Sequence, residues 1–186
     1  MTTPTASSLT SDLRLRKASH ARPAWEVHRA RQMDIADVKD LFCKLHAFNA
    51  ALDPRFALSD QWEAHFSTAM QRALCADDAI CFIAREIDSG LPCGFALAAL
   101  HHDSDMWRYH EWVEVEALYV EESWRGSGLA EILLNRACEW SERIGQSVIQ
   151  LYVTASNAHA LTFYERKGFR QTQAIMRKVL TRGPDR

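Results

Sequence analysis

The sequence predicts one globular domain of the α/β (α+β) class, built on a mixed sheet of mostly short strands. Segments with apolar residues at every third or fourth position alternate with short apolar runs, which are typical of helices and strands respectively. The chain has 186 residues, 47% of them hydrophobic, with 7 Gly and 5 Pro, a composition that excludes collagen-like and wholly disordered proteins. Residues 25–182 are expected to form the domain, and residues 1–24 a polar, flexible tail.

The first half of the domain predicts a strand, two consecutive helices and a hairpin. Asp34 precedes a run of apolar residues with helical spacing and is placed to cap that helix, while Asp60 and Glu63 form an acidic variant of the capping box for the next helix. The expected elements are a strand at 25–30, a helix from Asp34 to Phe48, a loop at 52–58, a helix from Asp60 to Cys75, and hairpin strands at 79–87 and 93–100.

The second half predicts strands and helices in alternation. Asn157 offers an amide oxygen to cap a helix, and Gly145 can adopt the left-handed conformation that ends one. The expected elements are a strand at 113–120, a helix from Leu129 to Gly145, a strand at 147–153, a short helix from Asn157 to Lys167, and an extended segment at 169–180. Residues 101–112, before the first of these strands, are polar and aromatic together.

The cysteine and hydropathy patterns indicate a cytoplasmic protein. The five cysteines are odd in number and form no C-x-x-C pair, which favours a reducing compartment over a disulfide framework or a zinc knuckle. No run approaches the roughly 18 apolar residues that a membrane helix needs, and residues 1–10 lack the apolar core of a signal peptide. We therefore expect no membrane partner and no metal.

A glycine-containing loop carries the strongest chemical signal. The sequence Arg125-Gly126-Ser127-Gly128-Leu129-Ala130 lies between an expected strand and the start of a helix. Glycines let a ligand approach the backbone, and the free N–H groups at a helix N-terminus suit a pyrophosphate, with Arg125 as a cationic donor. A Walker loop is excluded because Leu129 and Ala130 follow Gly128, and a dinucleotide fingerprint needs a different glycine spacing.

The loop and its flanks resemble the GNAT superfamily of acyl-coenzyme A dependent N-acyltransferases. Its signature, Arg/Gln-x-x-Gly-x-Gly/Ala, fits residues 125–130 at each fixed position, and residues 114–120 are similar to its fourth strand. Downstream, Asn157 and the Tyr164-Glu165-x-x-Gly168-Phe169 sequence resemble its Asn-capped helix and the ending of that helix. The resemblance implies a mixed, mostly antiparallel sheet of about six to seven strands flanked by about four helices, in a family that is often homodimeric.

The resemblance also implies where acetyl-coenzyme A, the acyl donor, binds. The loop N–H groups would hold the pyrophosphate, the fourth strand would bond the pantetheine arm through its main chain, and Asn157 would contact that arm or the thioester side. The implied coenzyme-binding residues are Leu118, Tyr119, Val120, Arg125, Gly126, Ser127, Gly128, Leu129, Ala130, Asn157, Ala160 and Phe163.

The implied reaction moves an acetyl group directly to a primary amine in a ternary complex. Tyr164 would protonate the leaving thiolate. The candidate bases are Glu116, which is nearer the opening, and Glu114, which matches the family position; the sequence does not decide between them. Alternation along a strand puts both on one face, whereas a bulge would separate them. Alternative bases are the histidines, because imidazole titrates near neutral pH: His101, His102, His110 and His159.

The charge distribution favours a cationic acceptor. Residues 34–122 hold 17 Asp and Glu against 6 Lys and Arg, while the flanks are basic. In the family the acceptor is selected by the regions that correspond here to 45–62 and 101–112. These regions carry Phe48, Phe56, Trp62, Trp107, Tyr109 and Trp112 among Asp53, Asp60, Asp103, Asp105 and Glu111. Aromatic rings with carboxylates suit an amine, a polyamine or a basic peptide.

Two other classes of function compete with catalysis. A domain of this family could bind acyl-coenzyme A as a sensor or scaffold without turnover, but a tyrosine together with strand carboxylates favours an enzyme. Nucleic-acid binding through the basic flanks is disfavoured, because they contain no recognised motif and the whole chain carries a net charge of -2.

Overall fold

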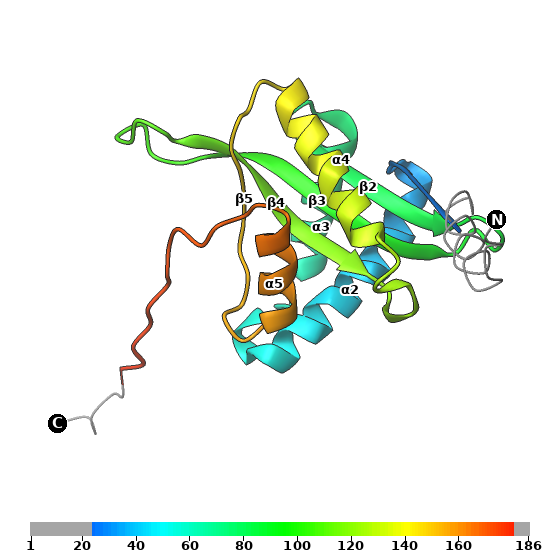
Figure 1. Cartoon of the computed structure of the whole chain (residues 1–186), viewed down its shortest axis with the longest axis horizontal. Coiled ribbons are helices and arrows are strands. Elements are labelled where there is room, and N and C mark those ends of the chain that lie inside the picture. The colour runs from blue at the N-terminus through cyan, green and yellow to red at the C-terminus, as the bar shows by residue number, and fades with distance from the viewer. Residues whose placement is uncertain (1–23, 181–186) are drawn as a thin grey trace, which may run out of the picture.

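The computed structural model describes residues 24–180 and contains one five-stranded sheet between two pairs of helices (Figure 1). The sheet order is β1-β2-β3-β4-β5, antiparallel except for the parallel pair β4 and β5. The strands are β1 (Trp25–Arg29), β2 (Ala79–Glu86), β3 (Pro92–His102), β4 (Glu111–Val120) and β5 (Ile149–Leu151). The helices are α2 (Ile35–Leu52), α3 (Trp62–Cys75), α4 (Leu129–Arg143) and α5 (Ala158–Arg166), with short 3-10 turns at Gln32–Asp34, Pro54–Phe56 and Glu122–Trp124.

The predicted class and element order are confirmed, but the number of strands is lower than expected. The described residues form five strands instead of six to seven, because the segment 169–180, expected to be extended, pairs with no strand there. The strand expected at 147–153 is shorter in the structure, where β5 spans Ile149–Leu151, because only these three residues of the segment pair with β4. The expected tail at 1–24 falls outside the described residues, except for Ala24.

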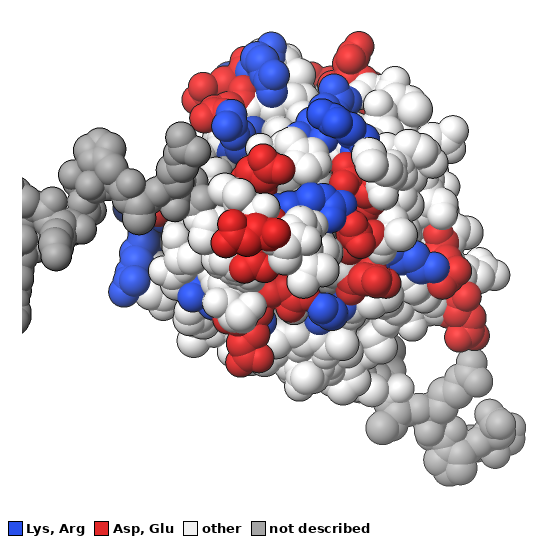
Figure 2. All heavy atoms as spheres, turned by 90° about the vertical axis from the view of Figure 1, so that its right-hand side faces the viewer, with Lys and Arg blue, Asp and Glu red and all other residues white. Residues whose placement is uncertain are grey.

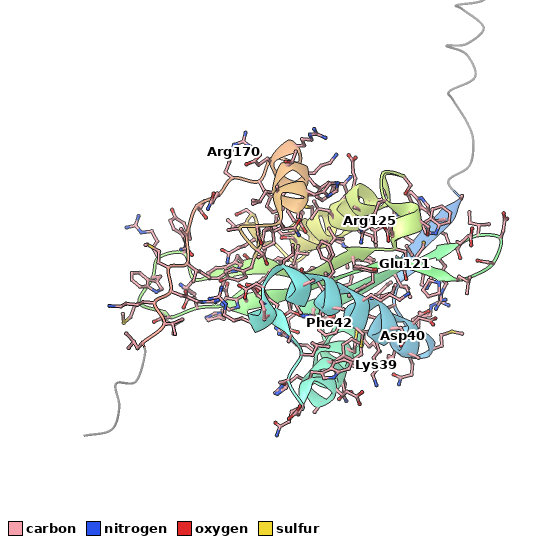
Figure 3. All side chains as sticks on the ribbon, turned by 90° about the horizontal axis from the view of Figure 1, so that it is seen from below. Lys39, Asp40, Phe42, Glu121, Arg125 and Arg170 are labelled. Atoms are coloured by element: carbon pink, nitrogen blue, oxygen red, sulfur yellow. The ribbon has the colours of Figure 1, made fainter. Side chains whose placement is uncertain are left out.

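Apolar side chains cover both faces of the sheet. Leu133 and Trp140 of α4 pack in one cluster, together with α5, and Leu41 of α2 and Met70 of α3 pack in the other. Figure 3 shows the sheet edge-on between these two layers. Because both faces are covered, β2 and β3 are buried nearly throughout, which explains their continuous apolar sequences.

The starts of the first two helices differ from the predicted caps. Asp34 occupies the N-cap position of α2, but its carboxylate accepts the Arg31 N–H at 2.9 Å and pairs with Arg85 of β2 at 2.5 Å instead of capping the helix. The helix α3 begins after Gln61, so the predicted capping box at Asp60 is wrong. There the turn is closed by the Trp62 N–H, which donates to the Ser59 carbonyl at 3.1 Å.

Candidate active site

Strand β4 carries a bulge at Glu116. Leu97 of β3 lies opposite Ala117, and the next residue, Ala98, lies opposite Val115, so Glu116 has no partner of its own in the ladder. A bulge of this kind inserts one residue and re-aims the side chains that follow it. Of the two alternatives that the sequence left open, regular alternation and a bulge, the structure shows the bulge, at Glu116.

The bulge changes the phase of alternation along β4. Val113 and Val115 pack in the cluster with α4, whereas Ala117 packs in the cluster with α2 and α3. Glu114 lies between the two valines and therefore faces α2 and α3. The charges that act on Glu116 come from Glu114, from Arg72 on α3 and from His101 at the end of β3, so the bulge leaves both glutamates close enough to interact.

The two glutamates occupy different environments. Desolvation, followed by the charge of Glu114, raises the pKa of Glu116, although Arg72 and His101 act in the opposite direction. Glu116 is nevertheless exposed by surface area, so the desolvation comes from atoms crowding the bulge and not from full enclosure. In Glu114, Oε2 is buried and has no hydrogen-bond partner among the described residues. A raised pKa makes Glu116 a stronger base than an ordinary glutamate.

Tyr164 approaches the sheet from the other face. Its helix, α5, begins as predicted, with the Asn157 side chain accepting the Ala160 N–H at 3.1 Å. The Tyr164 ring packs edge-on against Phe163 and Phe169, with centroids 5.1 and 5.6 Å apart. Burial raises the pKa of Tyr164 to about 12, so the phenol keeps its proton at neutral pH and can act as a donor.

The strands β4 and β5 separate beside Glu116. β5 pairs with β4 over Val113–Val115 alone, and from Glu116 to Val120 the described residues provide β4 with a partner only on its β3 side. Along this stretch Leu118 packs toward the cluster of α4 and α5, and Tyr119 toward α2 and α3. The unpaired edge can accept an extended ligand as an additional strand, with Tyr164 on one face of the sheet.

The glycine loop continues from the free edge of β4 to the start of α4. Gly126 and Gly128 have φ angles of 78° and 88°, which side chains with a Cβ disfavour. A Cβ at either position would meet no atom within 4 Å. The N–H groups of Gly126, Gly128 and Ala130 have no hydrogen-bond partner in residues 24–180. Three open N–H groups at a helix N-terminus fit the pyrophosphate of a coenzyme A molecule.

Side chains of α2 contact the residues that follow the C-terminal end of β4 (Figure 3). The Arg125 guanidinium lies over the Phe48 ring, 5.6 Å from its centroid, and Nε of Arg125 donates to the Val120 carbonyl at 3.4 Å. Glu121 pairs with Lys44 and accepts the Tyr119 hydroxyl at 3.3 Å. The sequence gives no sign that three of these charged residues belong to the site: Lys44, Glu121 and Arg72. Their partners are distant along the chain, so no local spacing links them.

The predicted acceptor residues divide into packing residues and exposed ones. Trp62 stacks on Phe42, with ring centroids 6.0 Å apart, and Asp53 caps the turn at 54–56 while pairing with Arg55. Trp107 and Tyr109, in contrast, are exposed between β3 and β4. The second group lies beyond the His101 and Trp112 pair, whose rings stack 4.6 Å apart. His159, one of the alternative bases, is exposed at the start of α5.

Comparison with known proteins identifies the family. Residues 46–169 match the acetyltransferase (GNAT) family. An uncharacterised N-acetyltransferase of Methanocaldococcus jannaschii is 24% identical over 152 residues, which cover 81% of this chain and 63% of the relative, so the chain spans less than two thirds of that protein. No helix of the described residues has both the length and the apolar character needed to cross a membrane.

Solved structures share the fold at low sequence identity. A mutant of the BH1408 protein from Bacillus halodurans superposes with a TM-score of 0.73 at 18% identity, covering 84% of this chain and 99% of the other. An aminoglycoside 6'-N-acetyltransferase from Acinetobacter baumannii gives 0.65 at 14%, covering 86% and 99%. The enzyme AAC(6')-Iy, in complex with a bisubstrate analogue, gives 0.65 at 20%, covering 84% and 98%. With a bulged and separated fourth strand, an open glycine loop and a family match over most of its length, this chain belongs to the acetyltransferase (GNAT) family.

Proposed function

We propose that the protein is an N-acetyltransferase that takes acetyl-coenzyme A as donor and acetylates a primary amine of a cationic acceptor. The main support for this proposal is that the unpaired edge of β4, which starts at Glu116, leads directly to the loop at residues 126–130, where N–H groups are free to bind a ligand. An extended arm that ends in a pyrophosphate matches this path. The structural neighbour AAC(6')-Iy is described in complex with a bisubstrate analogue of coenzyme A and acetylneamine, which supports both halves of the proposal.

In this proposal the chain binds two substrates and moves two protons. The main chain of Leu118 and Val120 bonds the arm, and the loop N–H groups bind the pyrophosphate. Glu116, directly or through water, takes a proton from the acceptor ammonium, so that the nitrogen can form a bond to the thioester carbonyl carbon. As the carbon–sulfur bond breaks, Tyr164 gives its proton to the departing sulfur, which leaves as the free thiol. After the nitrogen has bonded to carbon it loses its second proton, which returns through water to the Tyr164 phenolate. Glu116 releases the first proton to solvent, so the whole reaction frees one proton.

The charges around β4 support a cationic acceptor. Within residues 34–122, five of the six Lys and Arg residues are already paired with carboxylates of the same stretch. The carboxylates left without a Lys or Arg partner there include five on β4 and the connection before it: Asp103, Asp105, Glu111, Glu114 and Glu116. The exposed rings of Trp107 and Tyr109 lie in the same connection, and an ammonium group is attracted by both features.

The test is thiol release from acetyl-coenzyme A against polyamines, aminoglycosides, amino acids and basic peptides. We expect release that depends on the acceptor and that falls about 10- to 100-fold in Tyr164→Phe, with coenzyme binding by calorimetry unchanged. The reaction should be slowed and not abolished, because a thiolate already leaves readily. The exposed Tyr152 provides the matched control, Tyr152→Phe, which should keep full activity.

The competing function is a domain that binds acyl-coenzyme A without turnover. Tight coenzyme binding without thiol release for any amine would support that alternative and reject the enzyme. If neither binding nor release is found, the assignment of the β4 edge and the glycine loop to coenzyme A is wrong.

A further inference from the structure

The connection between β3 and β4 brings two histidines and an aspartate together at the projecting end of the sheet (Figure 1). Nε2 of His102 lies 3.4 Å from Oδ1 of Asp105, and Nε2 of His110 lies 4.0 Å from the same oxygen. One potential ligand atom from each of the three side chains lies within 4.8 Å of those of the other two. This cluster is separate from the glycine loop and from Tyr164, and no proton of the proposed acetyl transfer passes through it. The proposed function uses only the negative charge of Asp105, as one of the carboxylates that attract the acceptor.

Both imidazoles are held by their second nitrogen. Nδ1 of His102 lies 2.9 Å from Oε1 of Glu111, and Nδ1 of His110 lies 2.8 Å from the carbonyl oxygen of Trp107. A carboxylate and a carbonyl oxygen only accept hydrogen bonds, so each Nδ1 must carry the hydrogen and donate it. In a neutral ring, Nε2 then has a bare lone pair, and both Nε2 atoms are directed at Asp105.

With both rings neutral, the result is a group of three acceptors with no donor between them. Two nitrogen lone pairs and a carboxylate oxygen repel one another unless a cation lies among them. Two imidazoles and one carboxylate are a donor set that binds zinc and neighbouring first-row divalent ions, whereas magnesium and calcium prefer oxygen ligands alone. Histidines that bind such ions usually donate their other N–H to a carboxylate or a backbone carbonyl, as both rings do here.

The distances are compatible with an ion after a small adjustment. Ligand atoms about 2.0–2.1 Å from a tetrahedral zinc ion lie about 3.3 Å apart. The separation of His102 and Asp105, 3.4 Å, already fits, and that of His110 and Asp105, 4.0 Å, is longer. The ligand atoms of the two histidines lie within 4.8 Å of each other. His102 ends β3, while Asp105 and His110 lie in the connection that follows, where the His110 ring can close this difference.

We propose that His102, Asp105 and His110 bind one divalent transition-metal ion of the zinc class, with Glu111 and the Trp107 carbonyl orienting the two rings. The open side of the cluster leaves at least one coordination position to solvent, so the ion exchanges and is not locked in during folding. A bound ion ties the end of β3 to its connection with β4. It thereby orders the segment that leads from the exposed Trp107 to the start of β4.

The test uses the full-length chain, free of any affinity tag and stripped with a chelator. Titration with zinc chloride in a calorimeter should give one ion per chain, and cobalt(II) should give the visible absorption bands of a low-coordinate site. His110→Gln and Asp105→Asn should weaken zinc binding at least about 100-fold, and Glu111→Gln about 10- to 100-fold through the lost support of His102. The matched control is His65→Gln, an exposed histidine on α3.

Three results would overturn the proposal. They are the absence of saturable zinc or cobalt binding, a stoichiometry other than one, and equal binding by His110→Gln and His65→Gln. If neither zinc nor cobalt binds, and NMR titrations show that the two histidines take up a proton together, then the rings share a proton and not a metal ion. Circular dichroism of each variant, after metal has been removed with the chelator, checks that it is folded. Because the readout is metal binding, the outcome is independent of whether the protein transfers acetyl groups.

Discussion

At the scale of single residues, the bulge of β4 gives its two glutamates different surroundings, from which we predict different roles. Glu116 is solvent-accessible and has a raised pKa, whereas Oε2 of Glu114 is buried without a hydrogen-bond partner among the described residues. We therefore propose Glu116 as the base, since its pKa is raised first by desolvation and second by the charge of Glu114.

Replacing Glu116 by Gln should reduce activity and increase stability. The pKa of Glu116 is higher in the folded than in the unfolded chain, so the folded state is penalised progressively as the pH rises through and above the usual range of a glutamate. Glu116→Gln removes this penalty. We expect kcat/KM to fall about 100-fold, together with a higher Tm at pH 8 and no gain at pH 4, where the carboxyl is protonated in both states.

The same measurements on Glu114→Gln provide the comparison. This variant should keep more activity and shift the acidic limb of the pH–rate profile to lower pH, because Glu116 loses a negative neighbour. If Glu114→Gln instead shows the larger loss and Glu116→Gln is nearly active, the roles are reversed.

At the scale of elements, the sequence predicts what depends on local pattern and misses what depends on partners. Asn157 as a cap and the hairpin of β2 and β3 follow from neighbouring residues, and both are confirmed. The segment 169–180 has a strand-like sequence, but a strand forms only where it can pair with the edge of a sheet. The nearest edge strand along the chain, β5, is three residues long and pairs only with β4, so 169–180 stays without a partner among the described residues. Likewise, no local pattern indicates that the Asp34 carboxylate pairs with Arg85, 51 residues away, and does not cap its own helix.

Helix α2 is anchored to the sheet through this buried Asp34. Burial alone would raise the pKa of Asp34, but hydrogen bonds from Arg85 and the Arg31 N–H outweigh burial and hold the pKa below its usual value. Asp34→Asn should cost about 3 kcal/mol in urea unfolding at pH 7, because it leaves Arg85 with only the Asp37 carboxylate. The loss should shrink as the pH falls below about 3.8, the usual value of an aspartate, because Asp34 of the unfolded chain then takes up a proton before Asp34 of the folded chain does. It should be smallest once the pH has passed below the lowered pKa of the folded protein. The exposed Asp60→Asn should change stability by less than about 0.5 kcal/mol, and an equal loss in both variants would contradict the anchoring role.

At the scale of the whole molecule, the acidic excess is unevenly distributed. On the face shown in Figure 2, acidic and basic side chains are interspersed, in agreement with the ion pairs of Arg85 and Lys44. We expect the carboxylates of β4 and of its connection to β3, which have no Lys or Arg partner within residues 34–122, to be the local source of negative potential. The homodimer implied by the family resemblance stays a prediction, which light scattering coupled to size-exclusion chromatography would test.

An uneven field of this kind predicts how activity depends on salt. The Debye length falls from about 30 Å at 0.01 M to about 8 Å at 0.15 M ionic strength, so attraction of a multiply charged acceptor to the carboxylates near β4 should weaken over this range. We expect kcat/KM to fall more steeply with salt for a polyamine than for a monoamine. Asp103→Asn, in the connection before β4, should flatten the polyamine slope, whereas Asp88→Asn, in the turn between β2 and β3, should leave it unchanged. Equal slopes for both acceptors would mean that the carboxylates near β4 do not select the acceptor by charge, and the aromatic side chains would then be the remaining source of specificity.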